Sequence, residues 1–292
     1  MNKTKLLVLD IDNTIFDWVQ YYIPAFEQQL RFVSNLTNIP YETLCSESKE
    51  VFEEHHSIEY PFVVQQLPSI LSYYNNDINK MLNECVEPAR QQFKAYAKLK
   101  PYKGVATTLQ ALKEKDIKIV ALTDAPRYIS MWRLQHLELL HYFDAIYGLQ
   151  DPKLPILNNQ PVVTNDILIK HLNRKSFGFL GKIRILPDEY EKPSVKGMKM
   201  ILIDYEMDEK KDRKHVIYVG DNLKKDIKLA DALDITSVWF KPGTNVDASL
   251  YTTMQEFAPG KFIYRNVSEQ ATETPKPDHI VNDFSEILNI IV

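Results

Sequence analysis

Residues 6–14 read LLVLDIDNT, so that four consecutive apolar residues lead directly into a cluster of polar side chains. A short, continuous apolar run that ends in polar residues is typical of a strand that is buried on both faces of a sheet. Residues 117–122 (IKIVAL) and 215–219 (HVIYV) have much the same form and are followed by Thr123 and Gly220. We therefore expect three buried strands, each with a polar cluster at its carboxyl end.

Helical patterns lie between these strands. Residues 18–98 contain no glycine and carry apolar residues at helical spacing, which predicts an all-helical block. Further helices are expected at 127–141, 193–205 and 224–233, and further strands at 143–147, 236–240 and 279–281. Strands that alternate with helices form a parallel sheet with helices on both faces, and such sheets bind ligands beyond the carboxyl ends of their strands. The polar clusters are therefore expected to meet at one edge of the sheet.

The composition narrows the class of protein. The chain has 292 residues, of which 45% are hydrophobic and 25% charged, and its formal net charge is -4. These values exclude a disordered chain and give no overall attraction to nucleic acid or to an anionic membrane. Cys45 and Cys85 are too few for a disulfide scaffold, and the four-residue apolar run is too short for a signal peptide or a membrane span. We therefore expect a cytoplasmic protein that binds neither nucleic acid nor membranes, and its oligomeric state stays open.

Asp10 and Asp12 follow the first strand as two carboxylates, two positions apart. When the chain turns out of the sheet, both can face one pocket, where one could act as a nucleophile and the other as a proton donor or base. Neighbouring carboxylates repel each other unless a cation neutralises them, and a site lined by oxygens suits a hard divalent cation such as Mg²⁺. The same residues also fit an Asx turn or a helix cap at the end of a strand.

Three other elements carry polar residues that could complete such a site. Thr123-Asp124 follows the second strand, where a hydroxyl and a backbone N–H at a helix start could bind an anion or simply cap the helix. Lys192, which precedes a proline, could offer a point charge to a phosphate or lie on the surface with the other lysines. Asp221, after Gly220, could be a further oxygen ligand or part of an ordinary strand-to-helix turn.

Taken in order, these elements resemble the four motifs of the haloacid dehalogenase superfamily. The matching residues are Asp10-x-Asp12-x-Thr14, Thr123, Lys192 and Gly220-Asp221-x4-Asp226. The resemblance covers most of the chain in outline and is specific in these motifs. It implies an α/β fold, a three-layer Rossmann-like parallel sheet, with an all-helical cap domain inserted between the first two motifs. The catalytic core would comprise residues 1–16 and 100–292, and the cap residues 17–99.

The resemblance also implies a role for each motif. Asp10 would be the nucleophile that forms an aspartyl-phosphate, and Asp12 would protonate the leaving group and then activate water. The proposed ligands of Mg²⁺ are Asp10, the backbone carbonyl of Asp12, and Asp221, supported by Asn222 and Asp226. The phosphoryl oxygens would be held by Thr123, Asp124 and Lys192, with Lys153 as the alternative to Lys192.

An acid at position 12 favours phosphate chemistry, because the dehalogenases of this superfamily lack an acid there. The resemblance therefore implies a Mg²⁺-dependent phosphatase that hydrolyses a phosphomonoester of a small phosphorylated metabolite. The alternatives are a phosphotransferase or phosphomutase on the same scaffold, and a non-catalytic binding or regulatory protein.

Two segments depart from the simplest members of the superfamily. Residues 150–191 lengthen the interval between the second and third motifs, and we expect them to form a flap or loop insertion, with a hairpin around Gly178 and Gly181. Residues 243–277 contain no pattern that assigns them a role.

Overall fold

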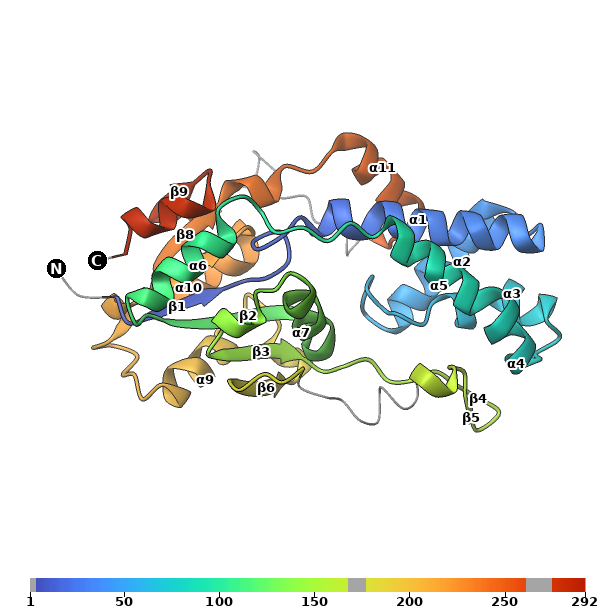
Figure 1. Ribbon diagram of the computed structural model, residues 1–292, viewed down its shortest axis with the longest axis horizontal. Coiled ribbons are helices and arrows are strands. Elements are labelled where there is room, and N and C mark those ends of the chain that lie inside the picture. The colour runs from blue at the N-terminus through green and yellow to red at the C-terminus, as the bar shows by residue number, and fades with distance from the viewer. Residues whose placement is uncertain (1–3, 168–176, 261–274, 292) are drawn as a thin grey trace.

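The computed structural model describes residues 4–167, 177–260 and 275–291. Within these ranges, the centre of the molecule is a seven-stranded sheet in the order β6-β3-β2-β1-β7-β8-β9 (Figure 1). Each strand pairs in parallel with its neighbours. The strands are β1 (Leu6–Leu9), β2 (Lys118–Pro126), β3 (Ala145–Leu149), β6 (Lys182–Leu186), β7 (Val216–Gly220), β8 (Thr236–Phe240) and β9 (His279–Val281). The predicted α/β fold with a parallel sheet is confirmed.

Helices cover both faces of this sheet, which gives the three predicted layers. Side chains alternate along β1, so that Leu7 and Leu9 pack into one apolar cluster and Leu6 and Val8 into another. The first cluster includes side chains of α6 (Val105–Glu114), α7 (Arg127–His136) and η9 (Phe284–Asn289). The second includes side chains of α9 (Lys196–Asp204) and α10 (Lys228–Ala232). The continuous apolar sequence of β1 follows from this burial on both faces.

Short 3₁₀ or π-helical turns join these elements. They are η3 (Leu140–Tyr142), η4 (Asp188–Tyr190), η5 (Arg213–His215), η6 (Leu223–Ile227) and η7 (Lys241–Thr244). The helix α7 is shorter than expected, because Glu138 adopts a left-handed conformation with φ of 58° and turns the chain into η3. In the ranges described above, none of the helices has the length and apolar character needed to cross a membrane.

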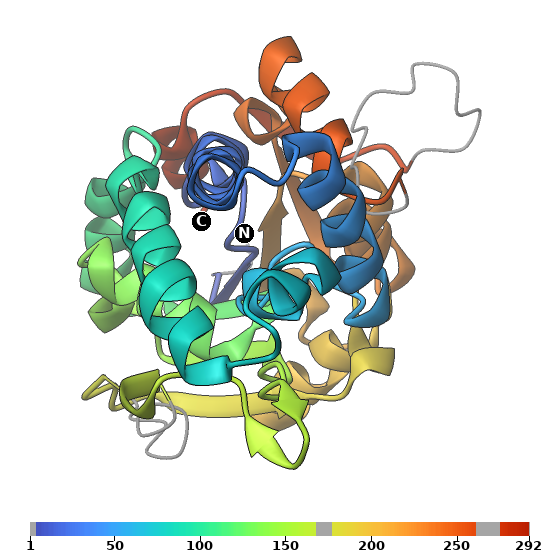
Figure 2. The same cartoon turned by 90° about the vertical axis from the view of Figure 1, so that its right-hand side faces the viewer.

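The residues between β1 and α6 are helical, as the sequence predicts. They form α1 (Trp18–Thr37), α2 (Tyr41–Glu54), η1 (Val64–Gln66), α3 (Pro68–Tyr73), α4 (Ile78–Met81), η2 (Leu82–Val86) and α5 (Glu87–Tyr96) (Figure 2). We refer to residues 18–96 as the helical block. Asp17 caps the start of α1 by accepting a 2.9 Å hydrogen bond from the Gln20 N–H. The two chain segments that join the block to the sheet lie side by side, since the Tyr102 N–H donates to the Ile15 carbonyl at 2.8 Å.

The segment after β8 contributes a helix that packs on the helical block. This helix, α11 (Ala248–Phe257), lies against α1 and α2 (Figure 1). The Phe257 ring packs on Phe26 with 4.8 Å between the ring centroids, and the Tyr41 hydroxyl donates to Glu256 Oε2 at 3.0 Å. Part of the segment 243–277 therefore joins the C-terminal half of the chain to the helical block. Residues 261–274 lie outside the described residues.

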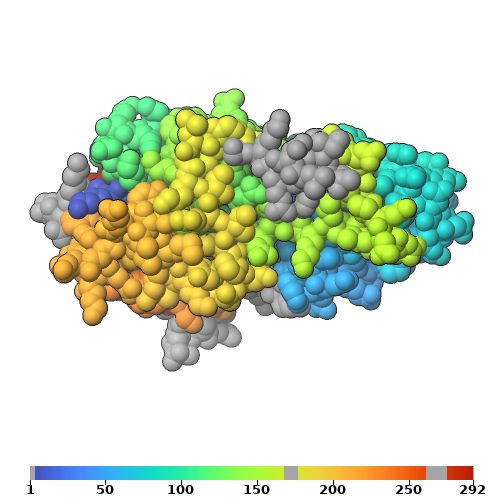
Figure 3. Space-filling model, turned by 90° about the horizontal axis from the view of Figure 1, so that it is seen from below, coloured from blue at the N-terminus to red at the C-terminus, as the bar shows by residue number. Residues whose placement is uncertain are grey.

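The long segment after β3 passes along the helical block before it returns to the sheet. Its first part contains the short antiparallel pair β4 (Ile156–Leu157) and β5 (Gln160–Pro161). Figure 3 shows this first part lying against the helical block. There, the carbonyl of Val162 accepts a 3.3 Å hydrogen bond from Gln65 Nε2. Residues 168–176 of the expected flap lie outside the described residues.

The expected hairpin around Gly178 and Gly181 would have its first arm in residues 168–176, which lie outside the described residues. The strand that follows Gly181 is β6, which pairs in parallel with β3 at the edge of the main sheet. A Cβ at Gly181 would lie 2.4 Å from the carbonyl oxygen of Asp144. Glycine is needed here because the backbone approaches the end of β3 closely.

Candidate active site

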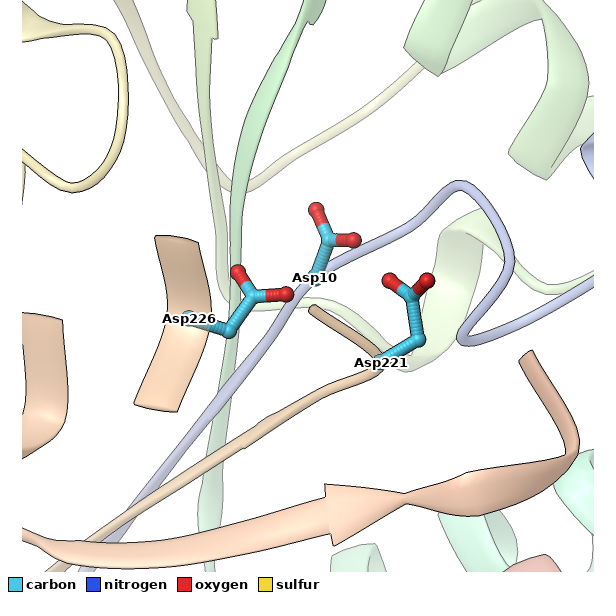
Figure 4. Close-up of side chains that lie close together, drawn as sticks. All are labelled: Asp10, Asp221 and Asp226. Carbon is cyan, nitrogen blue, oxygen red and sulfur yellow. The ribbon is translucent and has the colours of Figure 1, made fainter. Parts of the chain in front are cut away.

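Three carboxylates meet at the carboxyl edge of the sheet, where the topology predicts that the polar clusters converge. Asp10 follows β1, Asp221 follows β7, and Asp226 lies in η6 (Figure 4). All three are buried, and one oxygen atom from each lies within 4.8 Å of the others. They come together because β1 and β7 are adjacent and parallel, so that both strands end at the same edge.

Lys192 brings a positive charge into this cluster. Its Nζ lies 2.6 Å from Asp10 Oδ1 and 2.7 Å from Asp226 Oδ1, and the whole residue is buried. Its backbone N–H donates to Asp124 Oδ1 at 2.9 Å, which holds the loop before α9 in place. Lys153 is exposed and belongs to the segment beside the helical block. The fold therefore brings Lys192, and not Lys153, to the acidic cluster.

The acidic cluster carries more negative charge than the Lys192 ammonium can neutralise. Burial raises the pKa of Asp10 to about 8, although Lys192 opposes this rise. Burial, reinforced by the Asp226 and Asp10 carboxylates, raises the pKa of Asp221 well above its usual range. A divalent cation bound among these oxygens would favour their charged forms, and carboxylate oxygens are the ligands that hard cations prefer. The donor set therefore fits a divalent metal ion.

Asp12 pairs with a different cation. Its Oδ1 accepts a 2.9 Å hydrogen bond from Nη1 of Arg133 on α7. The other terminal nitrogen of Arg133 binds Oε1 of Glu59, which also accepts a hydrogen bond from the Trp18 indole. Burial raises the pKa of Asp12 to about 7, while Arg133 opposes this rise and Glu59 adds to it. Asp12 is thus a carboxyl group that can take up and release a proton near neutral pH.

Arg133 and Glu59 belong to the site although sequence reasoning assigns neither of them a role. They lie 74 positions apart, on α7 and in the helical block, and no motif joins them. One sequence signal is the position of Arg133 on the buried face of α7, where a charged side chain requires a partner. The guanidinium also lies over the rings of Phe16 and Tyr21, at 5.6 and 5.3 Å from their centroids.

Asp124, which follows Thr123, links the end of β2 to Lys192 and to the loop that carries Asp221 and Asp226. Its carboxylate accepts hydrogen bonds of 2.9 Å from the Lys192 backbone N–H and from Lys225 Nζ. Thr123 is 1% exposed, and its hydroxyl accepts a 3.0 Å hydrogen bond from the Ala125 N–H. Thr123 does not cap the next helix, because β2 continues beyond it and α7 begins only at the end of β2. The Asp124 side chain is used within the protein, so a contact with phosphate would have to come from its backbone N–H.

Asn222 and Gly220 shape the loop that carries Asp221 and Asp226. The Asn222 side chain caps η6 by accepting hydrogen bonds from two backbone N–H groups. The backbone N–H of Asn222 donates to Asp226 Oδ2 at 3.0 Å. A Cβ at Gly220 would lie 2.3 Å from Asp226 Cγ, so glycine is required for this close approach. The Trp239 indole donates to the Asp221 carbonyl at 2.6 Å. The position of both carboxylates is therefore fixed by the loop and by β8.

A cavity of about 400 Å³ lies beside Arg133, whose guanidinium also binds Asp12. It is lined by α1, α5 and α7 and by residues 59–64 of the helical block. Glu59 and Arg133 provide polar groups in its wall, so that one guanidinium contacts both the cavity and Asp12. Pockets of this size hold small organic molecules in other proteins.

The fold and the site together define a class of protein: an α/β enzyme whose buried carboxylates, at the carboxyl edge of a parallel sheet, can hold a divalent cation. The family model of the haloacid dehalogenase-like hydrolases matches residues 7–155, just over half of the chain. The chain belongs to this family and is a hydrolase. The family generally uses a divalent metal ion, in agreement with the buried acidic cluster.

Solved structures share this fold over nearly the whole chain. A predicted phosphoglycolate phosphatase from Haemophilus somnus 129PT is 17% identical, with a TM-score of 0.50 and 99% of each chain covered. A 2-haloacid dehalogenase from Pseudomonas syringae pv. tomato DC3000 is 15% identical, with a TM-score of 0.52 and coverage of 98% of this chain and 97% of the other. A HAD phosphatase from Thermococcus onnurineus is 16% identical, with the same TM-score and coverage. At these identities the similarity shows the fold alone. No curated protein matches the sequence.

Proposed function

We propose that the protein is a Mg²⁺-dependent phosphatase that hydrolyses a phosphate monoester of a small metabolite through an aspartyl-phosphate. The observation that carries this proposal is the different surroundings of the two carboxyl groups in the first motif. Asp10 faces Lys192 and the acidic cluster, whereas Asp12 faces Arg133 and Glu59. Two carboxyl groups in such different surroundings can divide the work of nucleophile and acid–base catalyst between them.

In the first step, an oxygen of the Asp10 carboxylate attacks phosphorus. The bond from phosphorus to the leaving oxygen breaks, and Asp12 gives its proton to that oxygen. The Lys192 ammonium, 2.6 Å from Asp10 Oδ1, is positioned to bind a phosphoryl oxygen and to stabilise the charge that develops during transfer. Thr123 and the backbone N–H of Asp124 are the further proposed contacts of the phosphoryl group.

In the second step, the Asp12 carboxylate takes a proton from a water molecule. This water attacks the phosphorus of the aspartyl-phosphate, the bond to Asp10 breaks, and inorganic phosphate leaves. Asp12 must be protonated in the first step and charged in the second. A pKa of about 7 suits both requirements near neutral pH.

The proposed ligands of Mg²⁺ are Asp10, Asp221 and the backbone carbonyl of Asp12, with Asn222 and Asp226 in supporting positions. When bound, the ion neutralises negative charge on the phosphoryl group and on the carboxylates around it. Asp226 has a second task, because its 2.7 Å contact with Lys192 helps to keep that lysine charged and directed towards Asp10.

The proposal is tested by measuring the release of inorganic phosphate from a panel of phosphorylated metabolites. The assay is run with Mg²⁺, with EDTA, and with the variant Asp10→Asn. The matched control is Asp231→Asn, which makes the same change at an exposed carboxylate on α10. We expect release that requires Mg²⁺, is lost in Asp10→Asn and is unchanged in Asp231→Asn.

Other outcomes would overturn the proposal in distinct ways. Full turnover in Asp10→Asn would show that Asp10 is not the nucleophile. Transfer of the phosphoryl group to a second hydroxyl, in place of water, would indicate a phosphotransferase or mutase. A lack of turnover with every compound, together with a stable protein partner in a pull-down, would indicate a binding protein.

A further inference from the structure

The cavity beside Arg133 points to the chemical class of the substrate, an inference that rests on the proposed function. We propose that this cavity binds the leaving group of the phosphate monoester, and that this leaving group carries a planar aromatic ring. Among the described residues, twenty line the cavity and eight of these are aromatic, whereas aromatic residues make up 11% of the whole chain. The walls are therefore much richer in ring surfaces than the chain as a whole.

The position of the cavity relative to Asp12 decides which part of the substrate it can hold. Because Asp12 is the proposed proton donor, the oxygen that leaves phosphorus has to lie beside its carboxyl group. Arg133 donates to that carboxyl at 2.9 Å and is itself part of the cavity wall. The cavity thus shares Arg133 as a neighbour with the proposed proton donor, and the alcohol portion of the substrate, which begins at this oxygen, occupies the cavity.

Aromatic side chains from three helices line this cavity. Tyr22 and Phe26 on α1 present nearly parallel rings, with 9° between their planes and 5.7 Å between their centroids. Phe93 on α5 meets Tyr22 at 64° and 5.6 Å, and Trp132 on α7 adds a further ring. Such faces and edges gain a specific attraction for a planar aromatic ring, beyond the burial of apolar area that any bulky group would provide.

Polar groups in the wall suit a ring that has heteroatoms. Glu59 can accept hydrogen bonds, Arg133 and Arg90 can donate them, and Gln29 can do both. Arg90 is only partly engaged, by a 3.4 Å contact with Glu87 on the same helix. A heteroaromatic alcohol therefore matches the cavity. Nucleoside 5′-monophosphates and phosphorylated pyridine alcohols share this chemistry, and the experiment distinguishes them.

The test compares kcat/KM for benzyl phosphate, cyclohexylmethyl phosphate and ethyl phosphate. All three are esters of primary alcohols, so their leaving oxygens are similar and the ring is what differs. We expect benzyl phosphate to exceed cyclohexylmethyl phosphate by about tenfold, the scale of an aromatic contact. Uridine 5′-phosphate measured against ribose 5-phosphate then tests a nucleobase, and pyridoxine 5′-phosphate tests a ring carried on the phosphorylated carbon.

Variants of Trp132 test whether the cavity is the source of this preference. In Trp132→Leu, which keeps apolar bulk and removes a ring, the ratio of benzyl to cyclohexylmethyl kcat/KM should fall severalfold. In Trp132→Phe, which keeps a ring, the ratio should stay high. The control is Tyr96→Leu, which removes an exposed aromatic side chain at the end of α5, and it should leave the ratio unchanged.

A binding measurement separates failure of this inference from failure of the proposed function. The affinities of benzyl and cyclohexylmethyl phosphate for Asp10→Asn are measured by calorimetry, where turnover is not required. Equal kcat/KM for the three esters in the wild-type protein would overturn the aromatic inference and leave the phosphatase intact. If no ester releases phosphate, the proposed phosphatase activity fails for these esters, and the affinities decide the aromatic inference. Binding of benzyl phosphate about tenfold tighter than that of cyclohexylmethyl phosphate supports the inference, and equal binding overturns it.

Discussion

Asp10 and Lys192 are 182 positions apart in the chain, yet their charged groups lie 2.6 Å apart in the structure. Asp221 and Asp226 share the same buried space, so three carboxylates meet one ammonium there. Without a metal ion, such a site favours protonation of its carboxyl groups, and the raised pKa of Asp10 expresses this preference. The electrostatics of the site therefore couple three properties: metal binding, proton binding and the stability of the fold.

We expect the metal-free protein to lose stability as the pH rises from about 6 to about 8. The pKa of Asp10 is about 8 in the folded protein and near 3.8 in the unfolded chain, so the folded state binds more protons in this range. Deprotonation therefore costs the folded state more than the unfolded state. Mg²⁺ should flatten this dependence, because it favours the charged carboxylates.

The measurement is the Tm in EDTA and in Mg²⁺ across this pH range. Asp10→Asn is the control that isolates the Asp10 contribution, and its Tm in EDTA should fall less steeply with rising pH than that of the wild-type protein. A wild-type Tm in EDTA that climbs with pH, with no difference from Asp10→Asn, would contradict the assignment of a raised pKa to Asp10.

Glu59 acts on Asp12 through Arg133, and this leads to a prediction about the pH profile of the proposed reaction. The Glu59 carboxylate contributes to the raised pKa of Asp12. In Glu59→Gln that contribution is absent, so the pKa of Asp12 falls and the proton donor loses its proton at a lower pH. We expect the alkaline limb of kcat to move to lower pH, with a loss of several-fold in kcat at about pH 8.

The measurement is kcat against pH for the wild-type protein and Glu59→Gln. Glu50→Gln makes the same change at an exposed position of α2 and should leave the profile in place. A shift of the alkaline limb to higher pH in Glu59→Gln would show that Glu59 does not raise the pKa of the proton donor.

At the scale of elements, α11 is the contact between the C-terminal half of the chain and the helical block. Phe257 is fully buried and packs on Phe26. Phe257→Ala would leave a cavity at this contact, and we expect it to lower the free energy of unfolding by about 3–5 kcal/mol. Tyr41→Phe removes the hydroxyl that makes the exposed hydrogen bond to Glu256 and keeps the ring, and we expect a change of about 1 kcal/mol or less.

Urea unfolding of both variants measures these free energies. If Phe257→Ala costs no more than Tyr41→Phe, then α11 is not anchored on the helical block through this ring. A large cost for Phe257→Ala alone would establish that the docking of α11 depends on apolar burial, and that the exposed hydrogen bond contributes little.

The elements also show how far the sequence predicts the molecule. The run LLVL before Asp10 is apolar because both faces of β1 are covered, so it predicts the strand, and the parallel topology then predicts that Asp10 and Asp221 meet. The sequence does not decide between Lys192 and Lys153, because the choice depends on where the chain returns to the sheet. Glycines near residue 180 resemble a turn signal, whereas Gly181 serves a close backbone approach.

The parts that could not be predicted are contacts between distant elements. Arg133 meets Asp12 and Glu59 across 121 and 74 positions of chain, and neither distance leaves a pattern in the sequence. The docking of α11 on α1 is of the same kind, because an amphipathic helix does not specify which apolar surface it will cover. A motif records residues that share one loop, whereas these contacts depend on the packing of the whole chain.

At the scale of the whole molecule, the helical block and the sheet are joined by more than the covalent chain. The two connecting segments pair through the hydrogen bond from Tyr102 to Ile15 and the bridge between Phe16 and Pro101. One continuous apolar cluster extends from the sheet face through the helices of the block to α11. We propose that residues 17–99 form the cap and residues 1–16 and 100–292 the catalytic core, and this apolar cluster joins the two parts.

A shared core predicts that the helical block and the sheet unfold together. We expect a single thermal transition for the wild-type protein, with the same midpoint by circular dichroism and by tryptophan fluorescence, because Trp18 and Trp132 lie beside the junction and report on it. The double variant Phe257→Ala with Glu59→Gln weakens two of the contacts that join the parts, and its transitions by the two probes should separate. Tyr96→Leu, at the exposed end of α5, should keep them coincident. Two separate transitions in the wild-type protein would show instead that the contacts across the junction are too weak to couple the parts, and the cap would then be an independently folding domain.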